Sequence, residues 1–402
     1  MKGFSYVSHR EVVILAGART PFGAFCGALR HYTATDLGVI ASKQALVRSG
    51  INADEIDHVI FGNVIQSSPD AAYLARHIGL KSGVPIETPA LTLNRLCGSG
   101  FEAIIHGAKE ILLGEAKFVL AGGTENMTQA PHQIWNAREG IPLGKGKMTD
   151  SLWEGLRDSY NGLPMGVTAE NLAKKYDIER QVSDQFSLES QEKTKLAKEK
   201  GHFKDEIVPI ELKRKNETIL LEHDEHPRPQ TSLEALSKLK PVFDPKGIVT
   251  AGSSSGISDG AAAVILTTKE EAERRHLPYL GTLKAYGVVG CDPDFMGIGP
   301  APAARKALLS LEKTVADMDL IEVNEAFAPQ VIAVERELGI RRDKLNVNGG
   351  AIALGHPLAA SGTRICLSLL LELNRAKKRF GLASACIGGG QGIAIIVESA
   401  QF

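Results

Sequence analysis

The alternation of strand-like and helix-like segments at both ends of the chain is the feature that most constrains its fold. Strand-like apolar runs occupy residues 11–18, 57–61, 88–94 and 117–121, and segments with helical spacing separate them. Strands that alternate with helices in this way pair in parallel, so we predict an α/β protein. The last third repeats the pattern, with strands predicted at residues 262–267, 280–290, 320–323, 345–348, 381–386 and 393–398.

The predicted helices have recognisable ends. The first spans residues 33–49, with Thr33 or Thr35 as its N-cap and Gly50 just beyond its last residue. Further helices are predicted at residues 70–80, 98–113 and 327–338, and from residues 301 and 357 onward.

The two ends of the chain also run in step with each other. Residues 56–62 can be laid on residues 318–324, so each end offers a strand with an aspartate at its start. Cys97 follows the first aspartate by 40 residues and His356 follows the second by 37, which places both at equivalent strand-to-helix turns. We therefore predict two pseudo-duplicated α/β halves packed together, with chance similarity between two α/β units as the alternative.

The middle of the chain departs from this pattern and is predicted to be an inserted loop subdomain. Strands fade there, and charged amphipathic helices are expected at residues 168–176 and 183–200, with an irregular loop at 223–230. The predicted domains are an N-terminal half of residues 1–126 plus 258–279, an inserted subdomain of residues 127–257 and a C-terminal half of residues 280–402.

Charge and hydropathy exclude several classes of protein. The formal net charge is −1, so no global field attracts nucleic acid or an acidic membrane. No apolar stretch approaches ~18 residues, so no transmembrane span is predicted. Residues 1–10 lack a signal-peptide core, and residues 400–402 are no peroxisomal signal. We predict a cytoplasmic protein, with a mitochondrial matrix location without a cleaved presequence as the alternative.

The five cysteines, at positions 26, 97, 291, 366 and 386, indicate a reducing compartment. Their number is odd, their spacings are wide and no CxxC pair occurs, so neither a disulfide framework nor a zinc site is predicted. No other cluster of ligands points to a bound metal. A small buried hydrophobe is the ordinary role for any single cysteine among them.

Cys97 has the sequence context of a nucleophile. It lies in residues 94–100, NRLCGSG, where a strand ends and a helix begins. A helix N-terminus offers free N–H groups and a positive dipole end, which lower a thiol pKa, and the turn also supplies donors for an oxyanion. The alternative is a structural cysteine buried in a tight turn.

Three further residues complete a candidate thiol-based site. His356, in a Gly-His-Pro turn after a glycine-rich run, is the best candidate for the base among eleven histidines. Cys386 ends a strand and enters the CIGGGQG loop, whose glycines can present N–H groups to a negative charge. This loop lacks the Lys-Ser/Thr ending of a P-loop. Asn324 follows a strand end, which suits a site residue, a helix N-cap or both.

Together these elements resemble the thiolase family, and the resemblance covers essentially the whole chain. It implies the thiolase fold, in which two pseudo-duplicated α/β halves pack together and carry an inserted loop subdomain. The set of motifs, in this order, is specific to the family. It comprises residues 18–23, 94–100, 122–127, 165–171, 324–327, 346–357 and 386–392.

The resemblance implies a mechanism with two thiols. Cys97 would accept the acyl group and His356 would activate it, while Cys386 would protonate the leaving carbanion and then deprotonate incoming coenzyme A. His356, together with a water on Asn324, would hold the enolate-like thioester oxygen. The backbone N–H groups of Cys97 and Gly388 would hold the tetrahedral oxyanion, and one such donor is typically worth ~3 kcal/mol of barrier.

The resemblance also implies ligands and partners. Coenzyme A would be a co-substrate, with no permanently bound cofactor, and the protein would be a homo-oligomer, either a dimer or a homotetramer. The implied contacts are Ser255, Leu156, Ala326 and Phe327 along the pantetheine arm, Arg228 near the adenine nucleotide, and Met165 and Met296 beside the acyl pocket. The alternative roles are core positions for Leu156 and Phe327 and a solvated loop cation for Arg228.

Departures from the family pattern bear on the loop geometry and on the substrate. Ser253 and Ser254 stand where Asn and Ala are usual, and Ala359 replaces a common glycine. Acetoacetyl-CoA-specific members often carry a histidine before the methionine that is Met165 here, but this chain has a proline there. That feature, with residues 151–153 and 224–230, looks more like the mitochondrial 3-ketoacyl-CoA thiolase branch of the family.

The predicted reaction is therefore CoA-dependent thiolytic cleavage of 3-ketoacyl-CoA to acetyl-CoA and a shortened acyl-CoA, as in fatty acid β-oxidation. An acetoacetyl-CoA-specific acetyl-CoA C-acetyltransferase is the alternative. A decarboxylating ketoacyl synthase would carry a histidine in place of Cys386, and a non-catalytic acyl-CoA-binding relative would tolerate loss of the catalytic residues, which are all present. A thioesterase side activity stays open.

Overall fold

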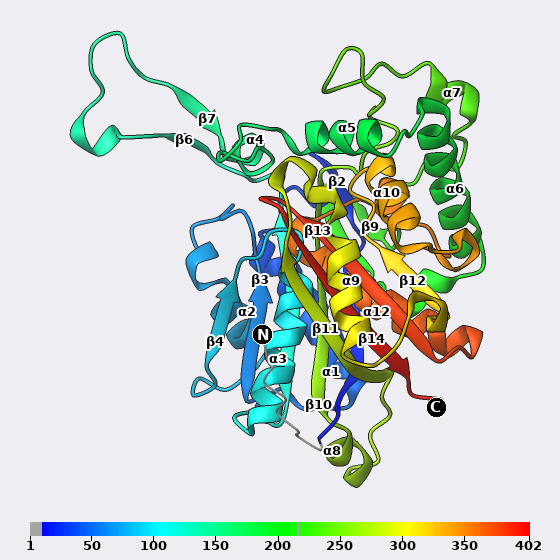
Figure 1. Cartoon of the computed structure of the whole chain (residues 1–402). Helices are drawn as coiled ribbons and strands as arrows, with labels where there is room; N and C mark the ends of the chain where they lie inside the picture. The colour runs from blue at the N-terminus through cyan, green and yellow to red at the C-terminus, as the bar shows by residue number, and fades with distance from the viewer. Residues whose placement is uncertain (1–9, 215–216) are drawn as a thin grey trace.

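In the computed structural model, which describes residues 10–214 and 217–402, a mixed sheet of ten strands runs through the molecule. Its order is β12-β13-β14-β11-β1-β10-β5-β3-β4, and β2 pairs with β10 (Figure 1). The strands are β1 (Val12–Arg19), β2 (Gly23–Ala24), β3 (His58–Gly62), β4 (Ala90–Leu93), β5 (Val119–Asn126), β10 (Ser258–Thr268), β11 (Gly281–Gly290), β12 (Leu320–Val323), β13 (Phe380–Ile387) and β14 (Gln391–Ser399).

The sheet consists of two similar halves joined by a short antiparallel pairing of β1 with β11. In the first half β3 pairs in parallel with β4 and β5, and in the second half β12 pairs in parallel with β13, while the other strand pairs within each half are antiparallel. The same carboxylate contact recurs in both. Asp57 Oδ2 accepts the N–H groups of residues 117 and 118 at 2.8 and 3.0 Å, and Asp319 Oδ2 accepts those of residues 379 and 380 at 3.0 Å. The predicted pseudo-duplication is confirmed at this level.

Helices separate and cover the two halves of the sheet (Figure 1). Helices α3 (Ser99–Leu113) and α12 (Leu358–Ala376) pack against each other between the halves. The first half is covered by α1 (Ala34–Ser49) and α2 (Leu74–Lys81), and the second by α9 (Pro300–Leu309) and α10 (Ala328–Leu338). Shorter helices are α8 (Lys269–Arg274) and α11 (Ala351–Leu354).

Both faces of the central strands are buried, which explains their unbroken apolar sequences. In β10, Val264 and Leu266 point into the cluster around α3 and α12, whereas Ile265 between them points into the cluster under α1. In β14, Ile393 and Ile395 likewise face the shared central cluster. Successive strand side chains alternate between faces, so a strand with helices on both sides is apolar throughout.

The inserted region carries helices α4 (Ser151–Gly155), α5 (Met165–Lys175), α6 (Arg180–Glu199) and α7 (Leu233–Ser237). It also contains two hairpins, β6 (His132–Ile134) with β7 (Met148–Asp150), and β8 (Ile210–Arg214) with β9 (Glu217–Leu221). The expected helices are present, and the strands, which were expected to fade here, remain as two short hairpins. The exact domain boundaries stay a prediction.

Two local predictions need correction. The strand predicted at residues 345–348 is only a bridge between Leu345 and Ile321, because Asn346 has φ 45° and turns the chain. The helix predicted from residue 70 starts with a 3-10 turn, and α2 begins at Leu74. At the first helix, Thr33 rather than Thr35 is the N-cap.

The described residues offer neither a membrane-spanning helix nor a cluster of metal ligands. Within residues 10–214 and 217–402, no helix is long and apolar enough to cross a bilayer. The same residues contain no group of three or more His, Cys, Asp or Glu side chains placed to hold a metal ion. The N-terminal segment in which we expected no signal-peptide core lies, except for Arg10, outside the described residues.

Candidate active site

Cys97 lies in a strained turn between β4 and α3. Leu96 has φ 47°, in the left-handed region that non-glycine residues rarely adopt at a cost of roughly 1–3 kcal/mol. The N–H of Gly98 donates to Arg95 O at 3.0 Å and that of Ser99 to Leu96 O at 2.9 Å. Cys97 as a residue is half-buried.

The expected lowering of the Cys97 pKa is wrong for the free protein. Burial raises the pKa of Cys97 to about 11, although the N–H groups of Gly388 and of Cys97 itself reach the sulfur and oppose the rise. Cys97 is therefore a protonated thiol at rest and needs a base when it attacks.

His356 is buried and arranged as a neutral base. Its Nδ1 lies 2.5 Å from Ser361 Oγ, and that hydroxyl also lies 3.0 Å from Pro357 O, which can only accept. Because the Ser361 hydroxyl donates its proton to this carbonyl, it can only accept from the ring. Nδ1 therefore carries the ring proton, and Nε2 keeps its lone pair. Burial lowers the pKa of His356 to about 3, with Arg364 adding to the effect, so the imidazole is uncharged at neutral pH.

Asn324 links the base to an unfilled hydrogen-bonding position. Its Nδ2 lies 3.3 Å from His356 Nε2, and its backbone N–H donates to Ser384 O at 2.9 Å. Its Oδ1 is buried and has no partner among the described residues. A buried amide oxygen without a donor is costly, so this position suits a water or another polar group bound beside the imidazole.

Cys386 is a second, fully buried thiol next to the first. It lies near the end of β13, opposite Gly392. Burial and the neighbouring thiols of Cys97 and Cys291 raise the pKa of Cys386 well above its ordinary value. A thiol kept protonated in a dry site is suited to donate its proton to a carbanion. All five cysteines are free.

The apolar residues predicted for the acyl and pantetheine arms gather around the two thiols. Leu156 packs with Cys97 in one small cluster, and Met165, Met296, Ala326 and Phe327 pack with Cys386 in another. Ser255 is joined to this wall, because its N–H donates to the carbonyl of Ala326 at 3.0 Å. The predicted apolar residues therefore belong to the clusters that contain the two thiols, and Ser255 is bonded to one of them.

Arg228 lines a separate cavity of about 150 Å³ that is walled by Gly252, Ser254 and Gly256. Its backbone N–H donates to Gln191 Oε1 at 2.8 Å, while the side chain is exposed. The loop of residues 250–256 thus connects the Arg228 cavity with the wall around the thiols. A cavity lined by an arginine fits the anionic end of a ligand.

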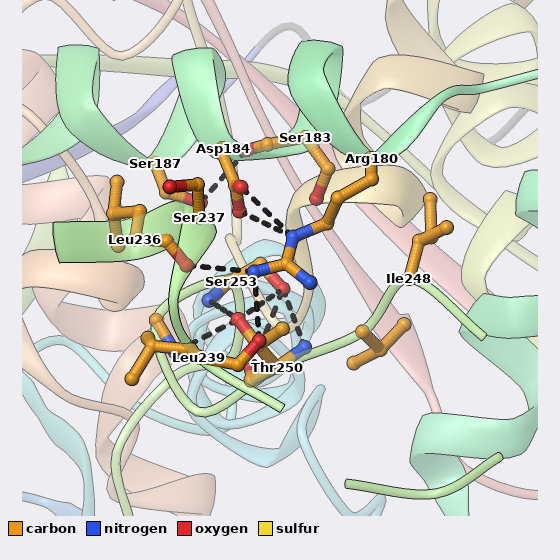
Figure 2. Close-up of polar contacts among 12 residues, drawn as sticks. Arg180, Ser183, Asp184, Ser187, Leu236, Ser237, Leu239, Ile248, Thr250 and Ser253 are labelled. Carbon is orange, nitrogen blue, oxygen red and sulfur yellow. Dashed lines mark hydrogen bonds and ion pairs between the residues drawn. The ribbon is translucent and has the colours of Figure 1, made fainter. Parts of the chain in front are cut away.

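The unusual serines of this loop keep its turn closed. Ser253 Oγ accepts the Thr250 N–H at 2.8 Å, and Ser254 Oγ donates to Thr250 O at 2.7 Å. Figure 2 shows Thr250 and Ser253 together with Arg180, which donates to Asp184, to the carbonyl of Leu236 in α7 and to that of Leu239 just after it. Both serine hydroxyls are thus hydrogen-bonded within the turn whose geometry the substitutions had put in question.

Comparison with known proteins decides the family. The model of the thiolase N-terminal domain matches residues 12–270, and that of the thiolase C-terminal domain matches residues 277–399. The chain belongs to the thiolase family. The predicted thiolase fold and the enzyme class, an acyltransferase of this family, are confirmed.

Relatives of this thiolase differ in their degree of similarity. The mitochondrial 3-ketoacyl-CoA thiolase of Homo sapiens is 53% identical over 391 residues, covering 97% of this chain and 98% of that protein. The crystal structure of human mitochondrial 3-ketoacyl-CoA thiolase in complex with CoA has a TM-score of 0.95 and 52% identity, covering 98% of this chain and 99% of that chain. An acetyl-CoA acetyltransferase of Cupriavidus necator is 44% identical over 390 residues, covering 96% of this chain and 99% of that protein.

Sequence reasoning missed Glu125, a buried carboxyl beside the thiolase nucleophile. It accepts N–H groups from Ile65 at 3.0 Å, Val64 at 3.1 Å and Ala359 at 3.3 Å. Burial raises the pKa of Glu125 to about 7 against these donors. The carboxyl holds the start of α12, directly after His356-Pro357, and its charge adds to the raised pKa of Cys97. Its place in the GGTENM run was the available signal.

Ser361, which fixes the imidazole, was also missed. It lies five positions after His356, one turn into α12, so that its hydroxyl reaches back to the ring. The spacing was visible in the sequence, but a serine in a helix commonly donates to a carbonyl one turn back and carries no distinctive pattern.

Proposed function

We propose that this thiolase cleaves 3-ketoacyl-CoA with coenzyme A, giving acetyl-CoA and an acyl-CoA shortened by two carbons. The observation that carries the proposal is a half-buried thiol, Cys97, beside a fully buried one, Cys386, with two N–H donors directed at the Cys97 sulfur and a neutral, buried imidazole at His356. The 53% identity to a 3-ketoacyl-CoA thiolase over nearly the whole chain supports the substrate class. The reaction would serve fatty acid β-oxidation.

In the first half-reaction, Cys97 Sγ attacks the C3 carbonyl of the substrate while His356 Nε2 takes the thiol proton. The tetrahedral oxyanion accepts hydrogen bonds from the N–H groups of Cys97 and Gly388, which are directed at the sulfur in the free protein. When the carbonyl reforms, the C2–C3 bond breaks and its electron pair leaves on C2. Cys386 Sγ–H protonates that carbon, so acetyl-CoA leaves and Cys97 keeps the acyl group.

In the second half-reaction, the Cys386 thiolate removes the proton of incoming coenzyme A. The coenzyme thiolate attacks the acyl group on Cys97, and the released Cys97 sulfur recovers its proton from His356. Every group thus returns to its starting state. The enolate-like oxygen that forms on acetyl-CoA would be held by the imidazolium N–H and by a water at the open Asn324 Oδ1.

Coenzyme A would lie along the apolar wall and end in the Arg228 cavity. Leu156, Phe327 and Ser255 would lie along the coenzyme near the thiols, and Arg228 would offer a charge to a phosphate at its outer end. An exposed arginine beside a phosphate gains a charge-assisted hydrogen bond without a large desolvation cost. The relative solved in complex with CoA supports coenzyme A as the ligand.

The test of the proposal is loss of the 3-ketothioester absorbance with a series from acetoacetyl-CoA to long-chain 3-ketoacyl-CoA. Faster cleavage of medium or long chains supports the 3-ketoacyl-CoA assignment. Cleavage of acetoacetyl-CoA alone would instead indicate an acetyl-CoA C-acetyltransferase, the function named for more distant relatives. Absence of any cleavage would refute both.

The protein would act as a homo-oligomer, a dimer or a tetramer. The β6–β7 hairpin projects from the body, and Leu143 and Trp135 on this arm are 103% and 64% exposed (Figure 1). Large apolar side chains on a projecting arm are typical of contact surfaces. Light scattering after size exclusion measures the mass, and a monomer that stays active would refute the assembly.

The compartment would be the mitochondrial matrix. The relative at 53% identity is named mitochondrial, which supports this alternative over the predicted cytoplasm. Fractionation of the source cells with a matrix marker would place the protein, and recovery with cytosolic markers would return the assignment to the cytoplasm.

A further inference from the structure

His226 lies between the Arg228 cavity and the catalytic base. Its ring lines the cavity and packs against two glycines that leave no room for a side chain. A Cβ at Gly256 would come within 2.3 Å of the ring, and one at Gly355 within 2.5 Å. Gly355 also has φ 96°, which disfavours any other residue directly before His356. The ring therefore fits into the turn that carries the base.

A short hydrogen-bonded path joins this ring to His356. His226 Nε2 lies 2.8 Å from Ser258 Oγ, and the same hydroxyl accepts the backbone N–H of His356 at 2.9 Å. Ser258 Oγ also lies 2.7 Å from Gly256 O, and the His356 N–H lies 3.1 Å from that carbonyl. The Ser258 hydroxyl is thus hydrogen-bonded to both histidines, and its loss would remove this link.

The loop that carries His226 is held by the two residues that precede the histidine. Asp224 pairs with the buried guanidinium of Arg19 at 2.6 Å. Glu225 Oε2 accepts the N–H groups of Ala24 and Ala28, each at 3.0 Å. These contacts fix the loop independently of Ser258. The position of the His226 imidazole is thus fixed by contacts other than Ser258, and the His356 turn can pack against it.

We propose that His226 and Ser258 are positioning residues for the thiolase base, and that they couple the Arg228 cavity to the His356 turn. A ligand that fills this cavity contacts the His226 ring, and the ring fixes the backbone from which the catalytic imidazole extends. This inference deepens the proposed function and rests on it. An error of 1 Å in the position of a catalytic group can cost about 100-fold in rate.

The test compares His226→Leu, which removes the hydrogen bond, with His226→Gln, whose amide can reach the same Ser258 oxygen. His223→Leu, which changes an exposed histidine of the same loop, is the matched control. Three quantities are measured for each full-length variant: kcat, KM for coenzyme A, and the rate at which iodoacetamide alkylates Cys97 between pH 6 and 9.

We expect His226→Leu to lower kcat and the neutral-pH alkylation rate together by about 10- to 100-fold. KM for coenzyme A should change by less than about 3-fold, and His226→Gln should recover most of both rates. A purely structural or ligand-contact role predicts otherwise. Unchanged kcat and alkylation in His226→Leu, or a rise in KM alone, would overturn the proposal.

Two further arms keep the test decisive. If His226→Leu does not fold, Ser258→Ala and Ser258→Thr form the same pair, because threonine retains the hydroxyl. Recovery by threonine but not alanine supports the proposal, and equal loss in both overturns it. Wild-type protein that alkylates at Cys97 but cleaves no 3-ketoacyl-CoA would refute the proposed function, while the alkylation series would still report on positioning.

Discussion

The turns that precede α3 and α12 occupy equivalent places in the two halves but carry different chemistry. The first presents Cys97, half-buried, after a strained Leu96. The second presents His356, buried and clamped by Ser361, after a glycine with positive φ. Because α3 and α12 pack together, duplication brings the two turns to one place. The similar strands and helices of the two halves therefore bring the two turns together, and sequence differences between the turns provide a nucleophile in one half and a base in the other.

The contacts that hold the strands of each half differ much less between the halves. Asp57 accepts the N–H groups of residues 117 and 118, and Asp319 accepts those of residues 379 and 380, at nearly equal distances. Structure that sets the strands in place is thus retained in both halves, while the turns have diverged. Four experiments probe this division, beginning with the residue on which the reaction depends most.

Replacing Cys97 by alanine should remove the acyl acceptor and lower the thiolysis rate by at least about 10⁴-fold, since loss of a covalent nucleophile has effects of this size. The 3-ketothioester absorbance measures the rate. Cys26→Ala, at an exposed cysteine, is the control and should retain activity. Residual turnover near the wild-type rate would show that the first half does not supply the nucleophile.

Replacing Cys386 by alanine should separate the two half-reactions. Acyl transfer from a simple acyl-CoA to Cys97 needs no carbanion and should persist, whereas cleavage of the carbon–carbon bond should fall by roughly 10³-fold with loss of its acid. Acyl-enzyme formation and thiolysis are measured on the same preparation. Normal condensation of acetyl-CoA by this variant would refute the division of roles.

Replacing His356 by asparagine should make the free energy of unfolding depend less steeply on pH in the acidic range. Between pH 6.5 and 3 the unfolded chain binds a proton at this histidine and the folded protein does not, because its folded pKa is lowered to about 3. The free energy of unfolding of the wild type therefore falls with falling pH, by about 1.4 kcal/mol per unit from this residue.

Urea unfolding from pH 7 to pH 5 tests that slope. Glu125, whose pKa is raised to about 7, acts in the opposite direction because its protonated form is favoured in the folded protein. The difference between wild type and His356→Asn isolates the histidine, since both proteins keep Glu125. Parallel curves for the two proteins would mean that the imidazole is charged when folded.

The smallest effects are expected for the shared carboxylates. Asp57→Asn and Asp319→Asn should each lower the free energy of unfolding by about 0.5–1.5 kcal/mol, the net value of such hydrogen bonds, and should leave kcat nearly unchanged. Asp54→Asn, at an exposed aspartate outside this contact, is the control. A much larger loss in one variant than in the other would show that the halves do not share this support.

Much of the architecture was predictable because periodicity and turn residues act locally. The strand and helix alternation indicated both halves, and the spacing of Cys97 and His356 from their aspartates indicated equivalent turns. The strand at 345–348 failed because Asn346 is committed to a turn by its side-chain bonds to the Val323 backbone, a tertiary effect. The hairpins of the insertion are too short to give a periodic signal.

The site was predictable in composition but not in electrostatics. Helix-terminus arguments favoured a thiolate at Cys97, yet the dry site raises its pKa, and burial cannot be read from one motif. Ser361 and Ser258 were missed because a single hydroxyl gains its role from what lies opposite it in space. Their importance appears only when the halves are folded together.

The most direct test is the intact mass of the protein after incubation with acetyl-CoA, followed by peptide mapping, for wild type, Cys386→Ala and Cys97→Ala. We predict one acetyl group on Cys97 in the first two proteins and none in the third. An acetyl group on Cys386, or an adduct that survives Cys97→Ala, would contradict the account in which the first half supplies the nucleophile.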